Sequence, residues 1–287
     1  MSERGPAARP VHAPPEGVVA ALRCSVCSAA LTRTGRALRC DNGHTFDLAR
    51  QGYVNLLHAA VDHGTADTAA MVTAREEFLS GDHYAPLADA LATRARGAFV
   101  VDAGAGTGHY LARVLDALPH ALGLALDVSA PAARRAARAH PRLGAAVWNL
   151  WQPWPVGSGV ADLVLNVFAP RNPAEFHRVL APGGRLLVAG PGPGHLRELA
   201  TSLPLLDIGD DKSERLDDAL GEHFDLVERA EVGGPVTLRP EDLRRVVRMG
   251  PNAHHLHRDA LGERLAALSE PTDVTTAFTV SVYERRG

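Results

Sequence analysis

The chain has 287 residues, of which 46% are hydrophobic and 22% are charged. This composition is typical of a folded globular protein and excludes disordered and fibrous classes. Thirty Lys and Arg residues against 33 Asp and Glu residues give a formal net charge of -3, so contact with nucleic acid would depend on local charge.

Residues 1–20 are rich in Pro and Ala and lack the apolar core of a signal peptide, so we expect a disordered tail. No stretch of the chain approaches the roughly 18 uninterrupted apolar residues that a membrane-spanning helix needs. The sequence therefore predicts a soluble protein with no membrane partner. The three cysteines all fall within the first 40 residues, and their odd number does not suit a secreted disulfide framework. A reducing cytoplasm is the expected location.

Residues 21–60 contain a Cys-x2-Cys pair, twelve intervening residues and a Cys-x3-His pair. The four residues are Cys24, Cys27, Cys40 and His44. Three thiolates and one imidazole at this spacing are typical of a structural zinc site. The alternative is three incidental cysteines and a turn histidine. However, every cysteine fits the pattern, and the segment is too small to bury a core of its own. We predict bound Zn²⁺ with four protein ligands, which leaves no open position for catalysis.

Residues 61–96 are predicted to form a helical linker, because the segment 85–95 (APLADALATRA) has the apolar spacing of an amphipathic helix. From residue 97 onward, short apolar runs alternate with helical segments. The expected strands are 98–103, 121–126, 145–148, 161–168 and 185–189, and the helices between them include 109–118, 131–139 and 173–180. This alternation predicts an α/β domain over 97–287 with a doubly wound, mainly parallel sheet. Further elements are expected as helices at 207–220, 240–249 and 258–268 and as strands at 224–230 and 275–283.

A glycine-rich loop follows the first strand of this domain. Asp102 precedes Gly104, Gly106 and Gly108, whose G-x-G-x-G spacing differs from the G-x-G-x-x-G of a dinucleotide site. Asp102 would also repel a phosphate. Asp127 ends the next strand about 20 residues later, where a carboxylate can accept hydrogen bonds from ribose hydroxyls. These features favour the S-adenosylmethionine site of class I, Rossmann-like methyltransferases over an NAD site.

Two asparagines follow later strands of the same sheet. Asn149 lies at the end of the third strand, where adenine would be recognised. Asn166 ends the fourth strand, facing the methyl-donor sulfur, and it can offer both a donor and an acceptor. A simple strand-end turn explains Asn166 equally well.

Several longer motifs are more distinctive than any single residue. They are HTFD at 44–47, QGYVNLL at 51–57, GDHYAPL at 81–87, FAP at 168–170 and GPGPGHL at 190–196. With the Cys and His pattern, they resemble the 23S rRNA (guanine-N1)-methyltransferases, the RlmA group, from about Leu22 to the C-terminus. VFAPRNP at 167–173 looks most like the macrolide-resistance branch of the tylosin type.

The resemblance implies methyl transfer from S-adenosylmethionine to N1 of a guanine in a 23S rRNA hairpin loop, and resistance to macrolides. The resemblance also allows a homodimer. Our own hypothesis is that the zinc module recognises the RNA hairpin while the sheet domain holds the cofactor. Carried over residue by residue, the resemblance also makes Tyr84, Gly106, Thr107 and His195 cofactor contacts. Without the resemblance, Tyr84 would be assigned to packing and His195 to capping.

The residues leave other functions open. A small-molecule methyltransferase of a biosynthetic pathway fits the net charge of -3. A further alternative is a non-catalytic RNA-binding module that retains a degenerate fold. No residue is marked as a general base. Phe168, Arg171 and the helix face of Arg244, Arg245 and Arg248 are candidates for stacking against a splayed-out base, although a solvated helix face is the ordinary explanation for the last three.

Overall fold

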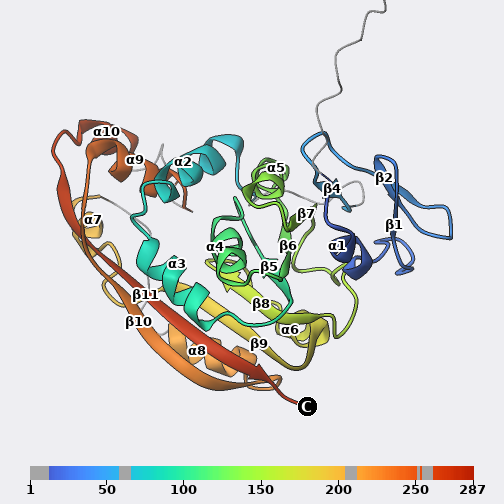
Figure 1. Ribbon diagram of the computed structural model, residues 1–287. Helices are drawn as coiled ribbons and strands as arrows, with labels where there is room; N and C mark the ends of the chain where they lie inside the picture. Colours follow the sequence, from blue (N-terminus) through green and yellow to red (C-terminus); the bar gives the residue numbers. More distant parts are fainter. Residues whose placement is uncertain (1–12, 58–65, 204–211, 251–252, 254–260) are drawn as a thin grey trace, which may run out of the picture.

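The structure is a computed structural model that describes residues 13–57, 66–203, 212–250, 253 and 261–287 (Figure 1). Residues 1–12 of the expected tail lie outside this description. The expectation of disorder was wrong for residues 16–20, which belong to helix α1 (Glu16–Ala21). Val18 and Val19 of this helix are buried, because they pack with the apolar face of the main sheet.

The cysteine-bearing segment forms a small antiparallel sheet in the order β1-β2-β3. Its strands are β1 (Thr32–Thr34), β2 (Ala37–Arg39) and β3 (Thr45–Asp47). The following strand, β4 (Val54–Asn55), leaves this sheet and pairs in parallel with β7 of the main sheet. The segment therefore extends the edge of the large sheet (Figure 1).

The main sheet has the order β10-β11-β9-β8-β5-β6-β7-β4. From β9 through β4 in this order, neighbouring strands run parallel. Strand β11 lies between β9 and β10 and is antiparallel to both. The strands are β5 (Phe99–Ala103), β6 (Leu122–Asp127), β7 (Leu143–Val147), β8 (Ala161–Val167), β9 (Leu180–Pro191), β10 (Phe224–Leu238) and β11 (Thr272–Arg285). The predicted doubly wound α/β sheet is confirmed.

Helices cover both faces of this sheet, so the central strands are apolar on both sides. In β5, Val100 and Val101 belong to opposite cores, as the alternation of side chains along a strand requires. One core receives α3 (Ala85–Arg94), α4 (His109–Ala117) and α5 (Ala130–Ala139). The other receives α1, α6 (Pro173–Val179) and α8 (Lys212–Leu220).

The remaining helices are α2 (Ala69–Leu79), α7 (Arg197–Ser202), α9 (Pro240–Arg248) and α10 (Leu261–Ala267). Helix α2 packs against α9 and α5, and α3 packs against α4. Strand β10 is longer than the predicted 224–230, since it continues through Gly233, Gly234 and Pro235 to Leu238. As the edge strand, β10 tolerates a proline that a central strand would not.

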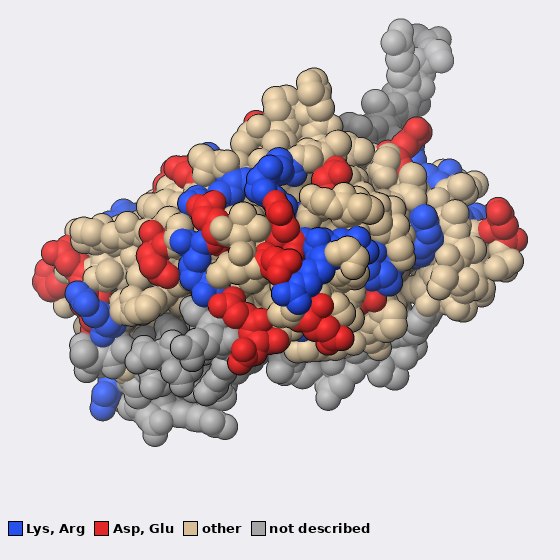
Figure 2. All heavy atoms as spheres, turned by 90° about the horizontal axis from the view of Figure 1, so that it is seen from below, with Lys and Arg blue, Asp and Glu red and all other residues tan. Residues whose placement is uncertain are grey.

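Positive and negative side chains are interspersed over the face shown in Figure 2. That face shows no broad field of one sign, in agreement with the net charge of -3. Within the described ranges, no helix combines the length and the apolarity needed to cross a bilayer.

Candidate metal centre and cofactor site

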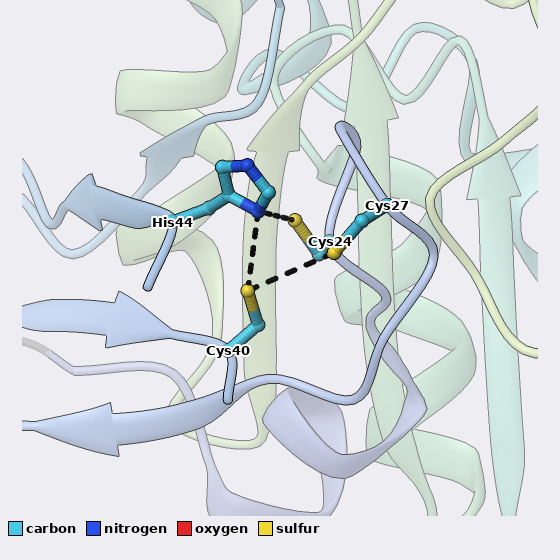
Figure 3. A group of neighbouring side chains, drawn as sticks. All are labelled: Cys24, Cys27, Cys40 and His44. Carbon is cyan, nitrogen blue, oxygen red and sulfur yellow. Dashed lines mark hydrogen bonds between the residues drawn. The ribbon is translucent and has the colours of Figure 1, made fainter. Parts of the chain in front are cut away.

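Cys24, Cys27, Cys40 and His44 converge on one point, as predicted (Figure 3). The Nδ1 atom of His44 lies 3.5 Å from Sγ of Cys24 and 3.4 Å from Sγ of Cys40. The sulfur atoms of Cys27 and Cys40 are 3.8 Å apart. Four ligand atoms at about 2.0–2.3 Å from one tetrahedral zinc ion would be separated by about 3.4–3.8 Å. The donor set and its spacing therefore fit Zn²⁺.

The surroundings of the cluster also favour metal ligation. Asn42 donates from Nδ2 to Sγ of Cys27 at 3.3 Å, and this hydrogen bond is the main reason that the pKa of Cys27 falls to about 6. A thiolate is the form that binds metal. Since all four ligands come from the protein, the ion has a structural role.

The glycine-rich loop joins β5 to α4 with the backbone conformations that its glycines allow. Gly104, Gly106 and Gly108 have φ values of 82°, 54° and 78°. A Cβ on Gly104 would lie 2.4 Å from Cβ of Ala169. Glycine is therefore required at this position by both backbone geometry and close packing.

Asp127 fixes this loop. One carboxylate oxygen accepts from the backbone N–H of Gly106 at 2.8 Å, and the other accepts from Ser129 at 2.8 Å. Burial is the main cause of the raised pKa of Asp127, although both hydrogen bonds oppose it. A carboxylate has about four acceptor positions, so hydroxyl groups can still bind to it.

Asp102 is buried beside the loop, and its carboxyl group is not fully hydrogen-bonded. Its side chain is 2% exposed, and Oδ1 has no hydrogen-bond partner among the described residues. Burial, and then the charge of Asp127, raise the pKa of Asp102 to about 8. The carboxyl group is therefore mostly neutral at pH 7, and an approaching cation would favour its ionised form.

Asn166 links the ends of β5 and β8. Its Nδ2 donates to the backbone oxygens of Ala103 at 3.2 Å and of Pro170 at 2.9 Å. Both amide hydrogens are thus used, and the buried Oδ1 has no partner in the described part of the chain. The buried Nε of Arg171 also lacks one. Because buried polar atoms without partners are rare, these atoms mark a place where a ligand is expected.

Tyr84 and His195 meet, although they are 111 positions apart. Nε2 of His195 lies 3.1 Å from the Tyr84 hydroxyl oxygen, and Nδ1 of His195 accepts from the backbone N–H of Ala277 at 3.1 Å. Since Nδ1 is an acceptor, Nε2 carries the hydrogen and donates it to Tyr84. Burial lowers the pKa of His195 to about 4, so the imidazole is neutral.

This tautomer assignment can be tested directly by NMR. We expect long-range ¹H–¹⁵N spectra to show His195 as the neutral Nε2–H form from pH 5 to pH 8, with an apparent pKa near 4. His120, which is exposed, serves as the internal reference. Titration of His195 between pH 6 and 7 would contradict the assignment.

An aromatic cluster surrounds Tyr84. Its ring centroid lies 5.0 Å from that of Phe78, 4.7 Å from that of Phe278 and 6.4 Å from that of Phe168. Phe78 and Phe278 were not predicted as site residues, because they look like ordinary core residues in the sequence. Phe168 differs from the others, because it has a φ of 53° and is 45% exposed.

Other expected or missed residues lie around the loop. Asn149 is engaged locally, since its Oδ1 accepts from the N–H of Trp151 at 3.0 Å. Thr107 is buried and lines a separate pocket between α2, α4 and α5. Arg75 of α2 was not predicted as a site residue, yet its Nη1 lies 3.2 Å from the position of a Cβ on Gly106.

Comparisons with known proteins agree with this geometry. A family model described as "RlmA, N-terminal", a zinc ribbon, matches residues 22–63. The chain is 48% identical over 274 residues to "23S rRNA (guanine(748)-N(1))-methyltransferase" of Streptomyces fradiae, covering 93% of this chain and 98% of that protein. It is 47% identical over 285 residues to "Putative 23S rRNA (guanine-N(1)-)-methyltransferase" of Micromonospora griseorubida, covering 91% and 96%.

Among solved structures, the chain is similar to the "Complex between the Haloferax volcanii Trm112 methyltransferase activator and the putative methyltransferase". The TM-score is 0.52 and the identity 19%, over 79% of this chain and 100% of the matched chain. At this identity the likeness shows the fold alone.

Proposed function

Because the chain belongs to the family of 23S rRNA (guanine-N1)-methyltransferases, we propose that it methylates N1 of a guanine in 23S rRNA, with S-adenosylmethionine as the methyl donor. The observation that carries this proposal is the buried carboxyl group of Asp102, which lacks a partner at Oδ1 beside a glycine loop held by Asp127. A site of this kind suits a cationic nucleoside ligand without phosphates.

The residues around the loop would divide the binding of the cofactor. We propose that Asp102 binds the cationic amino-acid end of the cofactor and that Asp127 binds its ribose hydroxyls. Gly104, Gly106 and Gly108 would let the backbone of the loop contact the cofactor closely. Further proposed contacts are Tyr84, Thr107, Asn149, Asn166 and His195. When bound, S-adenosylmethionine supplies a methyl group on an electron-poor sulfonium.

The protein's own contribution to the chemistry is mainly positioning. Guanine N1 carries a proton and becomes a good nucleophile only when that proton leaves. His195 is a poor base, because its pKa is about 4 and its Nδ1 is already hydrogen-bonded. Asp102 is largely protonated at neutral pH. Alignment of N1 with the methyl group, in a site that excludes water, can still lower the activation barrier. In favourable cases such alignment contributes about 7–11 kcal/mol.

Recognition of RNA is proposed for the zinc module. Arg33, Arg36 and Arg39 are exposed around the β1–β2 hairpin. Phosphate contacts by such side chains would give local electrostatic binding despite the negative net charge. A hairpin loop as the RNA element, a homodimer as the assembly and the cytoplasm as the location are further parts of the proposal, and they rest on the family resemblance.

Phe168 is proposed to stack on the splayed-out guanine. Its ring lies between the Tyr84–Phe278 cluster and solvent. Base–aromatic stacking contributes about 1–3 kcal/mol, so we expect Phe168→Ala to lower kcat/KM for an rRNA fragment about 5- to 150-fold. Affinity for S-adenosylhomocysteine should change little. Trp151→Ala, which removes another exposed aromatic ring, is the control. Equal losses in both variants would contradict the assignment.

Primer extension on rRNA tests the function as a whole. RNA from cells with the gene should show a new stop at one guanine of 23S rRNA, because N1 methylation blocks base pairing. Cells without the gene, or with the Asp102→Asn variant, should lack this stop. Raised tolerance of macrolides in the first strain alone would support the resistance role. Methylation of a free metabolite and not of rRNA would favour the small-molecule alternative.

A further inference from the structure

Arg75 places a positive charge against the glycine loop. Nη1 and Cδ of Arg75 lie 3.2 Å and 3.6 Å from the position of a Cβ on Gly106. The nearest atoms to the equivalent positions on Gly104 and Gly108 belong to alanine and leucine residues. Arg75 is therefore the cation that the described structure brings to this loop.

The guanidinium group is already bound to a carboxylate. Nη1 of Arg75 donates to Oδ2 of Asp67, and Nη2 donates to the backbone oxygen of Met249 at 2.6 Å. The side chains of Arg75 and Asp67 are 24% and 20% exposed. The pair also lies close to Asp127, because Ser129 donates from its backbone N–H to Asp127 at 2.8 Å and from its hydroxyl group to the backbone oxygen of Asp67 at 2.7 Å. The loop thus has a preformed position for a carboxylate, which Asp67 occupies.

The guanidinium group of Arg75 and the carboxyl group of Asp102 both lie near one side chain of α4, that of Tyr110. Burial raises the pKa of the Tyr110 hydroxyl group, and the nearby Tyr84 and Asp102 raise it further, whereas the charge of Arg75 lowers it. A cationic group and a carboxyl group thus lie within electrostatic range of the same residue, next to Gly106. This arrangement is complementary to the α-ammonium and α-carboxylate groups of a free amino acid.

We propose that Arg75 binds the α-carboxylate of the methionine moiety of the cofactor, in exchange for Asp67. The inference rests on the proposed function and adds a residue to the cofactor site. In the exchange one carboxylate replaces another on the guanidinium group, so no covalent bond changes. The planar guanidinium group suits this role, since it can bind a carboxylate through two hydrogen bonds.

Calorimetry with two ligands isolates the carboxylate. S-adenosylhomocysteine carries the amino-acid group, whereas S-adenosyl-3-thiopropylamine keeps the ammonium and lacks the carboxylate. For Arg75→Gln we expect at least 10-fold weaker binding of S-adenosylhomocysteine and less than a 2-fold change for the amine. Arg94→Gln removes a matched half-buried ion pair, with Glu228, and should change neither affinity.

Asp67→Asn separates the proposal from a structural role of the ion pair. It breaks the same pair but frees Arg75, so S-adenosylhomocysteine should bind equally or a few-fold more tightly. If Arg75→Gln does not fold, Arg75→Lys should still weaken S-adenosylhomocysteine selectively. Equal losses for both ligands, or parallel losses in the Asp67 and Arg75 variants, would overturn the inference. Failure of the unaltered protein to bind either ligand would instead overturn the proposed function.

Discussion

Replacement of Cys24 and Cys27 by serine is expected to abolish zinc binding and to lower rRNA methylation at least 100-fold. A structural zinc site contributes about 10–16 kcal/mol of apparent binding free energy to small domains, and that energy is also folding energy. The small β1-β2-β3 sheet has too little core to remain folded without it. Because the following strand β4 pairs with β7, its loss would also expose the edge of the main sheet.

Metal content by mass spectrometry, limited proteolysis and primer extension together measure this effect. Val26→Ser is the matched control, because Val26 is 53% exposed between the two cysteines and cannot bind the ion. We expect that variant to keep its zinc and its activity. S-adenosylhomocysteine should bind to the double variant if the main sheet stays folded. A zinc-free variant that is folded and methylates rRNA at the normal rate would refute the assignment of RNA recognition to the zinc module.

Replacement of Asp102 by asparagine is expected to stabilise the ligand-free protein and to weaken cofactor binding 30-fold or more. The folded-state pKa of Asp102 is about 8, against an ordinary value of 3.8. Between these values the folded protein binds more protons than the unfolded chain. The stability contribution is therefore complete below pH about 4 and is lost as the pH rises through 8. An asparagine side chain is neutral at every pH, so the stability of the Asp102→Asn variant relative to the unaltered protein should increase between pH 4 and pH 8.

Cofactor binding should have the opposite pH dependence. The ionised carboxylate binds a cation, so affinity in the unaltered protein should rise from pH 6 to pH 8 as Asp102 loses its proton. Removal of one partner from a buried charge pair costs about 2–5 kcal/mol, which is the basis of the expected loss. Urea unfolding and calorimetry at pH 6 and pH 8 measure both quantities. Asp89→Asn, at a 62% exposed position, is the control. A variant that is less stable at pH 8 and binds the cofactor normally would contradict the proposed role of Asp102.

The metal centre shows what local sequence can predict. Each pair, Cys24 with Cys27 and Cys40 with His44, lies on one short turn, so its spacing nearly fixes its geometry. The glycine loop is similar, because positive φ values at Gly104 and Gly106 depend on the residues themselves. The alternation of strands and helices was also readable, since the period of the apolar residues differs between the two.

The sequence was less informative where distant segments meet. The tail was assigned as disordered to residue 20, but α1 becomes a helix because Val18 and Val19 find apolar partners on the main sheet. Asn149 was predicted at the adenine, yet its side chain closes a local turn. The hydrogen bond in that turn uses one acceptor position of the Asn149 side chain, and adenine binding by Asn149 stays a proposal.

The sequence by itself determined the ligands of the metal, the fold class and the residues that form the glycine loop. Only the tertiary structure brought His195 to Tyr84 and Arg75 to Gly106, and left the Asp102 carboxyl group neutral. The physical reason is the range of the interactions. Turn geometry and side-chain periodicity act over a few residues, whereas burial and charge depend on neighbours that the chain supplies from far away.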